Sequence, residues 1–144
     1  MGPEKTTDKT LAIIHLALVI GQILFAVICV MLIEKTEIIL NDTSDIFLFL
    51  VPAFAVFGLI ASNLVFKKML DQLNQKNNPA DKLAAYRSAF IIRCALLEAP
   101  SLLGIVAYYL QGNFLYIFIS GFIILFFITI RPTKEKIEID LNIA

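Results

Sequence analysis

The hydropathy pattern divides most of the chain into four long apolar runs. They cover residues 11–33, 46–66, 84–110 and 113–130. A helix that crosses the hydrocarbon core of a bilayer needs about 20 mostly apolar residues, and in lipid a helix satisfies its own backbone hydrogen bonds. The pattern therefore predicts an all-α, polytopic membrane protein: a four-transmembrane-helix bundle that forms a single integral membrane domain over residues 1–144.

Two segments outside the apolar runs carry local signals. The stretch 77–81, Asn-Asn-Pro-Ala-Asp, predicts a break followed by a helix N-cap, so we expect the third helix to begin near Lys82, before it enters lipid. Pro132 predicts the end of the fourth helix, which leaves 131–144 as a tail. Apolar and polar residues alternate over 137–143 of this tail, and we interpret it either as a strand for the sheet edge of a partner or as a frayed end.

The basic residues are distributed very unevenly between the two sides of the predicted bundle. Eleven of the twelve Lys and Arg residues fall in the N-terminal tail, the middle loop with its flanks, and the C-terminal tail. The segment between the first two runs holds Lys35 against four acidic residues. Because cytoplasmic loops of membrane proteins carry an excess of Lys and Arg, we expect both termini to be cytoplasmic.

Composition excludes several classes of protein. The chain is 59% hydrophobic and 17% charged, with a formal net charge of zero and a mean hydropathy of +0.84. Soluble domains are about 45–50% apolar and about 25% charged, so this composition argues against a soluble enzyme, a disordered chain, a disulfide scaffold and a nucleic-acid-binding domain. The single His has no metal-spaced partner, and a glycine-rich phosphate loop is absent from the sequence. We therefore expect no enzymatic activity, no cofactor and no metal site.

Glu98 is the most informative residue of the sequence. Counted from Phe90, it lies ~12 Å into the hydrocarbon at ~1.5 Å per residue. An acidic group near the centre of a membrane helix costs roughly 2.5–3.5 kcal/mol, so we expect Glu98 to face the bundle interior. Such a carboxyl could exchange a proton or bind a cation. Alternatively, it could be a neutral group that joins two helices by a hydrogen bond.

Helical spacing indicates which side chains could join Glu98. Ser101 shares its face of the third helix, whereas Arg93 lies ~140° away and is expected to extend to the headgroups or to approach Glu98 through the groove of another helix. On the first helix, His15, Gln22 and Cys29 are seven residues apart and share one side. The candidate ion- or proton-binding residues are Glu98, Gln22, Ser101, His15 and Arg93.

Two resemblances extend this interpretation. Residues 97–107, Leu-Glu-Ala-Pro-Ser-Leu-Leu-Gly-Ile-Val-Ala, resemble the ion-carrying helix of rotary-ATPase proteolipid (c-type) subunits, which implies that Glu98 is an ion-binding carboxylate. Here Pro100 follows the carboxylate, and the first two runs do not have the closely spaced glycines of proteolipid rings. The motifs 98–100, 112–113 and 131–137 resemble a group of small four-span bacterial inner-membrane proteins, which implies the same fold and an inner-membrane location without an established activity.

Two functions remain open at this point. The first is proton- or cation-coupled transport through the membrane-embedded carboxyl of Glu98. The second is a non-catalytic accessory or assembly subunit of a larger membrane complex, in which the same polar residues join helices. In either case we expect a lipid bilayer around the protein, a homo-oligomer or a membrane-protein partner, and no nucleic acid.

Overall fold

The computed structural model describes residues 3–34, 36–40, 42, 44–73 and 78–141, and its described residues are mostly helical. There are five helices in the described chain: α1 (Pro3–Leu32), α2 (Phe47–Leu73), α3 (Pro79–Gln111), α4 (Phe114–Thr129) and α5 (Lys134–Asp140). The predicted all-α class is confirmed. Each predicted apolar run coincides with one of α1 to α4, although α1 begins earlier than its run and α2 ends later.

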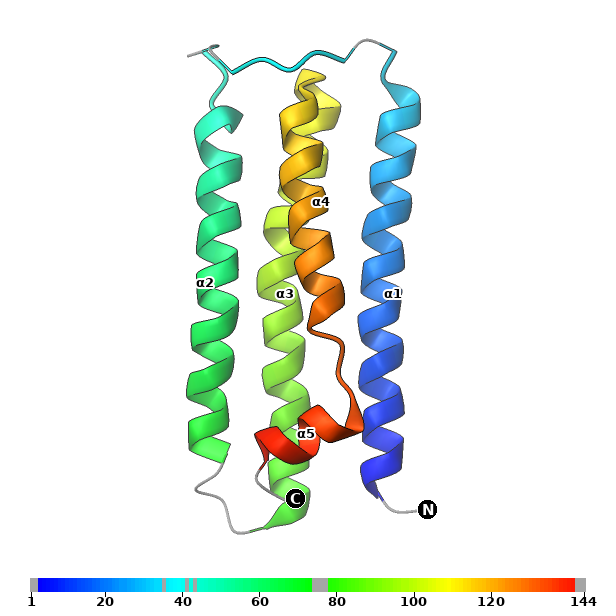
Figure 1. Cartoon of the computed structure of the whole chain (residues 1–144), viewed down its shortest axis with the longest axis vertical. Helices are drawn as coiled ribbons and strands as arrows, with labels where there is room; N and C mark the ends of the chain where they lie inside the picture. The colour runs from blue at the N-terminus through cyan, green and yellow to red at the C-terminus, as the bar shows by residue number, and fades with distance from the viewer. Residues whose placement is uncertain (1–2, 35, 41, 43, 74–77, 142–144) are drawn as a thin grey trace.

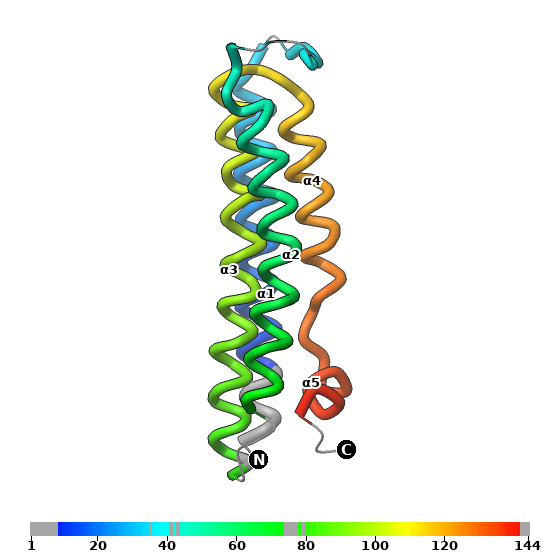
Figure 2. The backbone as a smooth tube through the Cα atoms, turned by 90° about the vertical axis from the view of Figure 1, so that its left-hand side faces the viewer, coloured from blue at the N-terminus to red at the C-terminus, as the bar shows by residue number. Residues whose placement is uncertain are grey.

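The four long helices are arranged as a row of three with a fourth on one face. Figure 1 shows α3 between α2 and α1, and Figure 2, turned by 90°, shows α4 lying against one side of that row. The chain runs up and down, so α1 and α3 point in the same direction. Both termini lie at one end of the bundle, which we call the terminal end, and the α1–α2 and α3–α4 connections lie at the other, the loop end (Figure 1).

Length and composition make α1, α2 and α3 candidates for membrane spans. These three helices are long and apolar enough to cross a bilayer. The 16-residue α4 is long and apolar enough only when it is taken together with α5. The chain bends by 80° at the break between these two helices. The described chain thus holds three candidate spans, or four if α4 and α5 count as one.

The ends of α3 follow from the residues that cap it. The side chain of Asn78 accepts a hydrogen bond from the Ala80 backbone N at 3.1 Å and caps α3, so the helix begins at Pro79, before the expected start near Lys82. At the other end Gly112 has φ 66°, the left-handed conformation that glycine adopts easily, and its N–H donates to the Tyr108 carbonyl. The helix continues across Pro100, which lies inside it.

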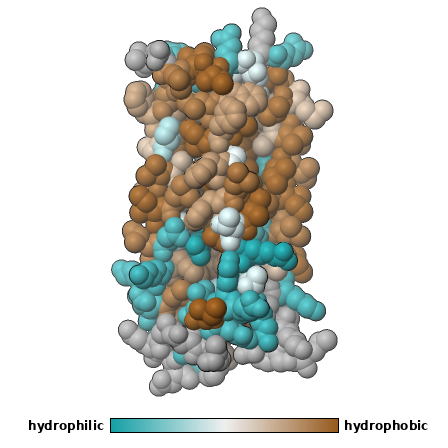
Figure 3. All heavy atoms as spheres, in the orientation of Figure 1, coloured by the Kyte–Doolittle hydropathy of each residue, from teal (hydrophilic) through white to brown (hydrophobic). Residues whose placement is uncertain are grey.

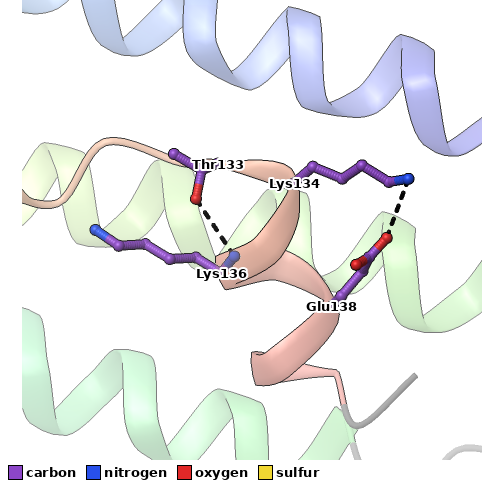
Figure 4. Close-up of polar contacts among 4 residues, drawn as sticks. All are labelled: Thr133, Lys134, Lys136 and Glu138. Carbon is purple, nitrogen blue, oxygen red and sulfur yellow. Dashed lines mark hydrogen bonds and ion pairs between the residues drawn. The ribbon is translucent and has the colours of Figure 1, made fainter. Parts of the chain in front are cut away.

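Residues 134–140 of the tail form a helix, so neither the predicted strand nor the predicted frayed end describes them, and residues 142–144 lie outside the described residues. Thr133 caps α5 by accepting from the Lys136 backbone N at 3.3 Å, and Lys134 pairs with Glu138 at 3.3 Å (Figure 4). Ile137 and Leu141 are both buried. Their spacing of four residues places them on one helical face, and packing of that face against the bundle stabilises a helix where the alternating pattern suggested a strand.

Close helix packing joins α3 to α2 and α4. A Cβ atom at Gly58 of α2 would lie 2.7 Å from the Leu96 carbonyl oxygen and 2.7 Å from Cγ of Pro100. At Gly104 of α3, a Cβ atom would collide with the Ser120 hydroxyl of α4. These positions admit no side chain because the backbones approach so closely.

At the loop end, hydrogen bonds tie the connections together. Asn113 accepts from the Leu115 and Ile39 backbone N atoms at 3.1 and 3.3 Å, and its amide donates to the Ile39 carbonyl at 2.7 Å. Asp45 accepts from the Phe47 backbone N at 2.9 Å and from the Tyr116 hydroxyl. Asn113 and Asp45 therefore join the two connections to the helices through hydrogen bonds.

The outer surface of the long helices is strongly apolar. Figure 3 shows apolar residues over the loop-end and middle parts of the visible face, and polar residues gathered toward the terminal end. Large apolar side chains are exposed on every long helix, among them Ile13, Met31, Phe49, Phe57, Leu64, Phe122 and Leu125. A surface of this kind is compatible with a membrane environment.

Candidate functional site

The contact between α1 and α3, which we call the α1–α3 seam, holds buried polar side chains at the middle of the bundle. Near the terminal end, the His15 and Phe90 rings are 6.2 Å apart. Nearer the loop end, Cys29 and Tyr108 belong to one buried cluster. Gln22 is seven residues from both His15 and Cys29. Because α1 and α3 run in the same direction, Gln22 lies about level with the stretch 97–101 of α3.

Three side chains of the seam are buried without a hydrogen-bond partner among the described residues. Gln22 is 1% exposed, and Ser101 and Tyr108 are 0% exposed. Both amide atoms of Gln22, the Ser101 hydroxyl and the Tyr108 hydroxyl lack partners within the described chain. A buried polar group without a partner costs about 1–3 kcal/mol. The seam therefore offers unused donors and acceptors at the middle of the bundle.

Glu98 lies at the edge of this seam. Its side chain is half-buried. Around α3, its neighbours on one side, Ser101 and Ile105, are fully buried, and those on the other side, Ile91 and Tyr109, are exposed. Ser101 is about 60° from it around the helix at ~100° per residue. The carboxyl is thus less enclosed than the expected interior position, because its place on α3 marks the border between the surface packed on α1 and the outer surface.

His15 connects α1 to α4. It is 4% exposed, its Nε2 donates to the Phe127 carbonyl at 2.7 Å, and its ring is stacked on that of Phe127 with centroids 5.0 Å apart. The histidine is therefore a packed residue with a hydrogen-bond partner, at the terminal-end side of the seam.

Arg93 is separated from the other predicted residues. It contacts α2, where its Nη2 donates to the Asn63 side-chain oxygen at 2.8 Å and its guanidinium lies 4.6 Å above the centre of the Phe66 ring. This contact is not the predicted approach to Glu98, whereas the extension of Arg93 to the headgroups stays a prediction. Of the five candidate residues, His15 and Gln22 are buried on α1, Glu98 and Ser101 lie on α3 at about the level of Gln22, and Arg93 contacts α2.

Arg93 belongs to a cavity that sequence reasoning missed. The cavity has a volume of about 500 Å³ and lies at the terminal end, between α2, α3, α4 and α5. Tyr86 donates to Asp140 at 3.0 Å, and Lys136 donates to the Thr129 carbonyl at 3.0 Å. These residues meet because α5 folds back onto the bundle, and the sequence carried no signal for that turn.

Metal binding and disulfide formation find no support in the described part of the chain. Its His, Cys, Asp and Glu side chains form no group of three or more that could hold a metal ion. Cys29 and Cys94 are both free and buried. The polar chemistry available is that of a carboxyl, an amide, hydroxyls and a guanidinium.

Comparison with known proteins gives no further guide to this site. No protein family matches the chain, and no curated protein or solved structure is significantly similar to it.

Proposed function

We propose that this protein is a four-span integral membrane protein, with both termini cytoplasmic, that binds a proton or a small cation at Glu98 and couples its movement to transport. The observation that carries the proposal is the group of unpartnered buried polar side chains in the α1–α3 seam, beside the half-buried carboxyl of Glu98. An ionisable group within a membrane helix is costly to retain unless it is used.

The bilayer setting rests on the outer surface and the charges. Apolar side chains cover the long helices, and most basic residues belong to segments at the terminal end. The positive-inside rule then favours a cytoplasmic terminal end. In this setting α4 is the fourth span, α5 turns away from it at the cytoplasmic end, and a bacterial inner membrane is the proposed location.

The chemistry follows from the oxygen atoms near the middle of the seam. Carboxylate, amide and hydroxyl oxygens are the ligands that hard cations prefer, and Glu98, Gln22 and Ser101 supply one of each. A flexible glutamate at the edge of the seam can turn its carboxyl toward Ser101 or toward the outer surface. Binding a proton or a cation changes the charge of the carboxyl and therefore favours one position over the other.

Reconstituted protein tests the proposal. Proteoliposomes with an internal pH-sensitive dye, driven by an imposed membrane potential, should show proton flux above that of empty liposomes, and an external sodium gradient extends the assay to cations. We expect Glu98→Gln to lower that flux at least about tenfold, whereas Glu135→Gln, an exposed carboxyl of α5, should leave it unchanged. Equal flux in wild type and Glu98→Gln would refute the proposal, as would no flux above that of empty liposomes.

A second candidate function is that of an accessory or assembly subunit, and the partial exposure of Glu98 favours it. A carboxyl at the outer edge of α3 is placed to accept a hydrogen bond from a helix of another chain, and such bonds join membrane helices. This function predicts stable association with other proteins in detergent extracts, measured by native mass spectrometry. It also predicts that Glu98→Ala is unstable and not merely inactive, while a pure homo-oligomer argues against it.

A further inference from the structure

The cavity around Arg93 is a second polar site, separate from the α1–α3 seam. α2 contributes Asn63 and Phe66, α3 contributes Tyr86 and Arg93, and α5 contributes Lys136 and Asp140. Its volume of about 500 Å³ is within the usual range of small-molecule sites, which begins near 300 Å³. Four helices meet here, so the site exists only in the folded chain.

Positive charge exceeds negative charge in this cavity. Arg93 is half-buried. Among the described residues no carboxylate oxygen lies within 4.0 Å of its guanidinium nitrogens, and the ion pair found in this part of the chain is Lys134–Glu138. Its Nη2 is used by Asn63, while its Nε is buried without a partner in the described chain. Asp140 accepts from Tyr86, and Lys136 donates to a backbone carbonyl. Two cationic side chains thus share the cavity with one carboxylate.

The walls of the cavity are partly apolar. Beside the polar groups it is lined by Phe66, Phe90, Phe126 and Ile130. A simple inorganic anion would leave these side chains without a contact, whereas an organic anion has an apolar part to place against them. The surplus of one positive charge also fits a single negative charge better than two, because Asp140 would repel a dianion.

We propose that the Arg93 cavity binds a small organic monoanion, a carboxylate with an aromatic or branched apolar group. The carboxylate pairs with the guanidinium group of Arg93 and lies near Lys136, and the apolar group contacts the phenylalanine side chains. Guanidinium groups hold carboxylates by short, charge-assisted hydrogen bonds. This site does not depend on proton or cation movement at Glu98.

α5 forms one wall of the site through Lys136 and Asp140. The Tyr86–Asp140 and Lys136–Thr129 hydrogen bonds hold the helix across the terminal end of the bundle. Figure 4 shows the Lys136 side chain extending away from the Lys134–Glu138 pair, which lies on the other side of α5. A ligand carboxylate near Lys136 would therefore leave that ion pair intact.

Benzoate and benzamide provide a matched pair of probes, since they share size and shape and differ in charge. Thermal unfolding of the full chain in neutral detergent, at constant ionic strength, should show a saturable rise in Tm with benzoate and none with benzamide. We expect Arg93→Gln to weaken benzoate binding at least about tenfold, because it removes a charge-assisted hydrogen bond. Lys68→Gln, an exposed base of α2 outside the cavity, should bind benzoate as the wild type does.

Two further measurements keep the result independent of folding and of transport. Lys136→Gln changes an exposed side chain and should weaken benzoate binding about threefold. Because its hydrogen bond to Thr129 is exposed, its loss should lower the Tm without ligand only slightly. Glu98→Gln should bind benzoate normally, so failure of transport and failure of this site are distinguishable.

The proposal is overturned if benzoate gives no saturable shift in Tm, if benzamide or inorganic phosphate gives an equal shift, or if the benzoate shift survives in a folded Arg93→Gln protein.

Discussion

Helix α1 and helix α2 flank the same central helix but are attached to it in different ways. α2 meets α3 at Gly58, where the two backbones are so close that a methyl group does not fit. α1 meets its neighbours through a narrow stripe that includes His15, Gln22 and Cys29, and a Cβ at its Gly21 would have nothing within 4 Å. The helices α2, α3 and α4 are thus joined by close backbone packing, whereas α1 is joined mainly by side chains, several of them polar.

This difference shows where the molecule can change without losing its fold. Close backbone contacts leave little freedom for repacking. A side-chain interface with unpartnered polar groups is less tightly specified, and a proton, a cation or water molecules could be accommodated there. The seam between α1 and α3 is therefore the more suitable place for a function that needs movement.

The largest expected effect concerns the close α2–α3 contact. Gly58→Ala should lower the free energy of unfolding by about 2 kcal/mol or more, because the new methyl group meets a backbone carbonyl and a proline ring, neither of which can turn away. Denaturant unfolding in detergent micelles measures this. The matched change Gly21→Ala on α1 should be neutral or stabilising by up to about 1 kcal/mol, since alanine favours helix. Equal losses in the two variants would contradict the contrast between α1 and α2.

An intermediate effect is expected at the middle of the seam. Gln22→Leu should raise the free energy of unfolding by about 1 kcal/mol, because it removes a buried amide whose two polar atoms lack partners in the described chain. The same variant should lower proton or cation flux, so stability and activity should change in opposite directions. Gln72→Leu, at an exposed position of α2, is the control for stability and should change it by less than about 0.5 kcal/mol. A marked loss of stability in Gln22→Leu would show that the amide is satisfied.

The smallest effect is expected at the terminal-end side of the seam. His15→Leu should cost about 0.5 kcal/mol, because the Phe127 carbonyl loses a hydrogen bond but keeps the longer one from the Ile130 N at 3.3 Å. His15→Gln, which retains a donor, should recover part of the loss. If His15→Leu and His15→Gln are equally stable in thermal unfolding, this hydrogen bond does not attach α1 to α4.

The long helices were predictable because each carries its own signal. The fourth apolar run, 113–130, differs from α4 (Phe114–Thr129) by a single residue at each end. The break before α3 was evident from Asn78 and Pro79, but these residues begin the helix and do not precede it, so its start was placed too late. Hydropathy marks the apolar part of a helix and not its ends, so the polar first turns of α1 and the last turns of α2 were not anticipated.

The Arg93 cavity was not predictable because its residues are distant in sequence and meet through tertiary packing. Arg93 and Asn63 are 30 residues apart, and Tyr86 and Asp140 are 54 apart. Their meeting depends on the turn after Thr129 and on the burial of Ile137 and Leu141, which a pattern of alternating polar and apolar residues does not reveal. For the seam, the common side of His15, Gln22 and Cys29 was correctly predicted from their spacing, since that spacing is local to one helix.

The shortness of α4 has a consequence for the surrounding lipid. Sixteen residues span about 24 Å of the roughly 30 Å hydrocarbon core, whereas α1 and α3 are each long enough to cross it completely. If the helices cross a bilayer as proposed, its cytoplasmic leaflet must thin beside α4, or α5 must sink into the headgroup region to fill the gap. Either adjustment makes the insertion energy depend on hydrocarbon thickness, so bilayers of shorter acyl chains should favour this protein, and longer chains should strain it on the α4 face first.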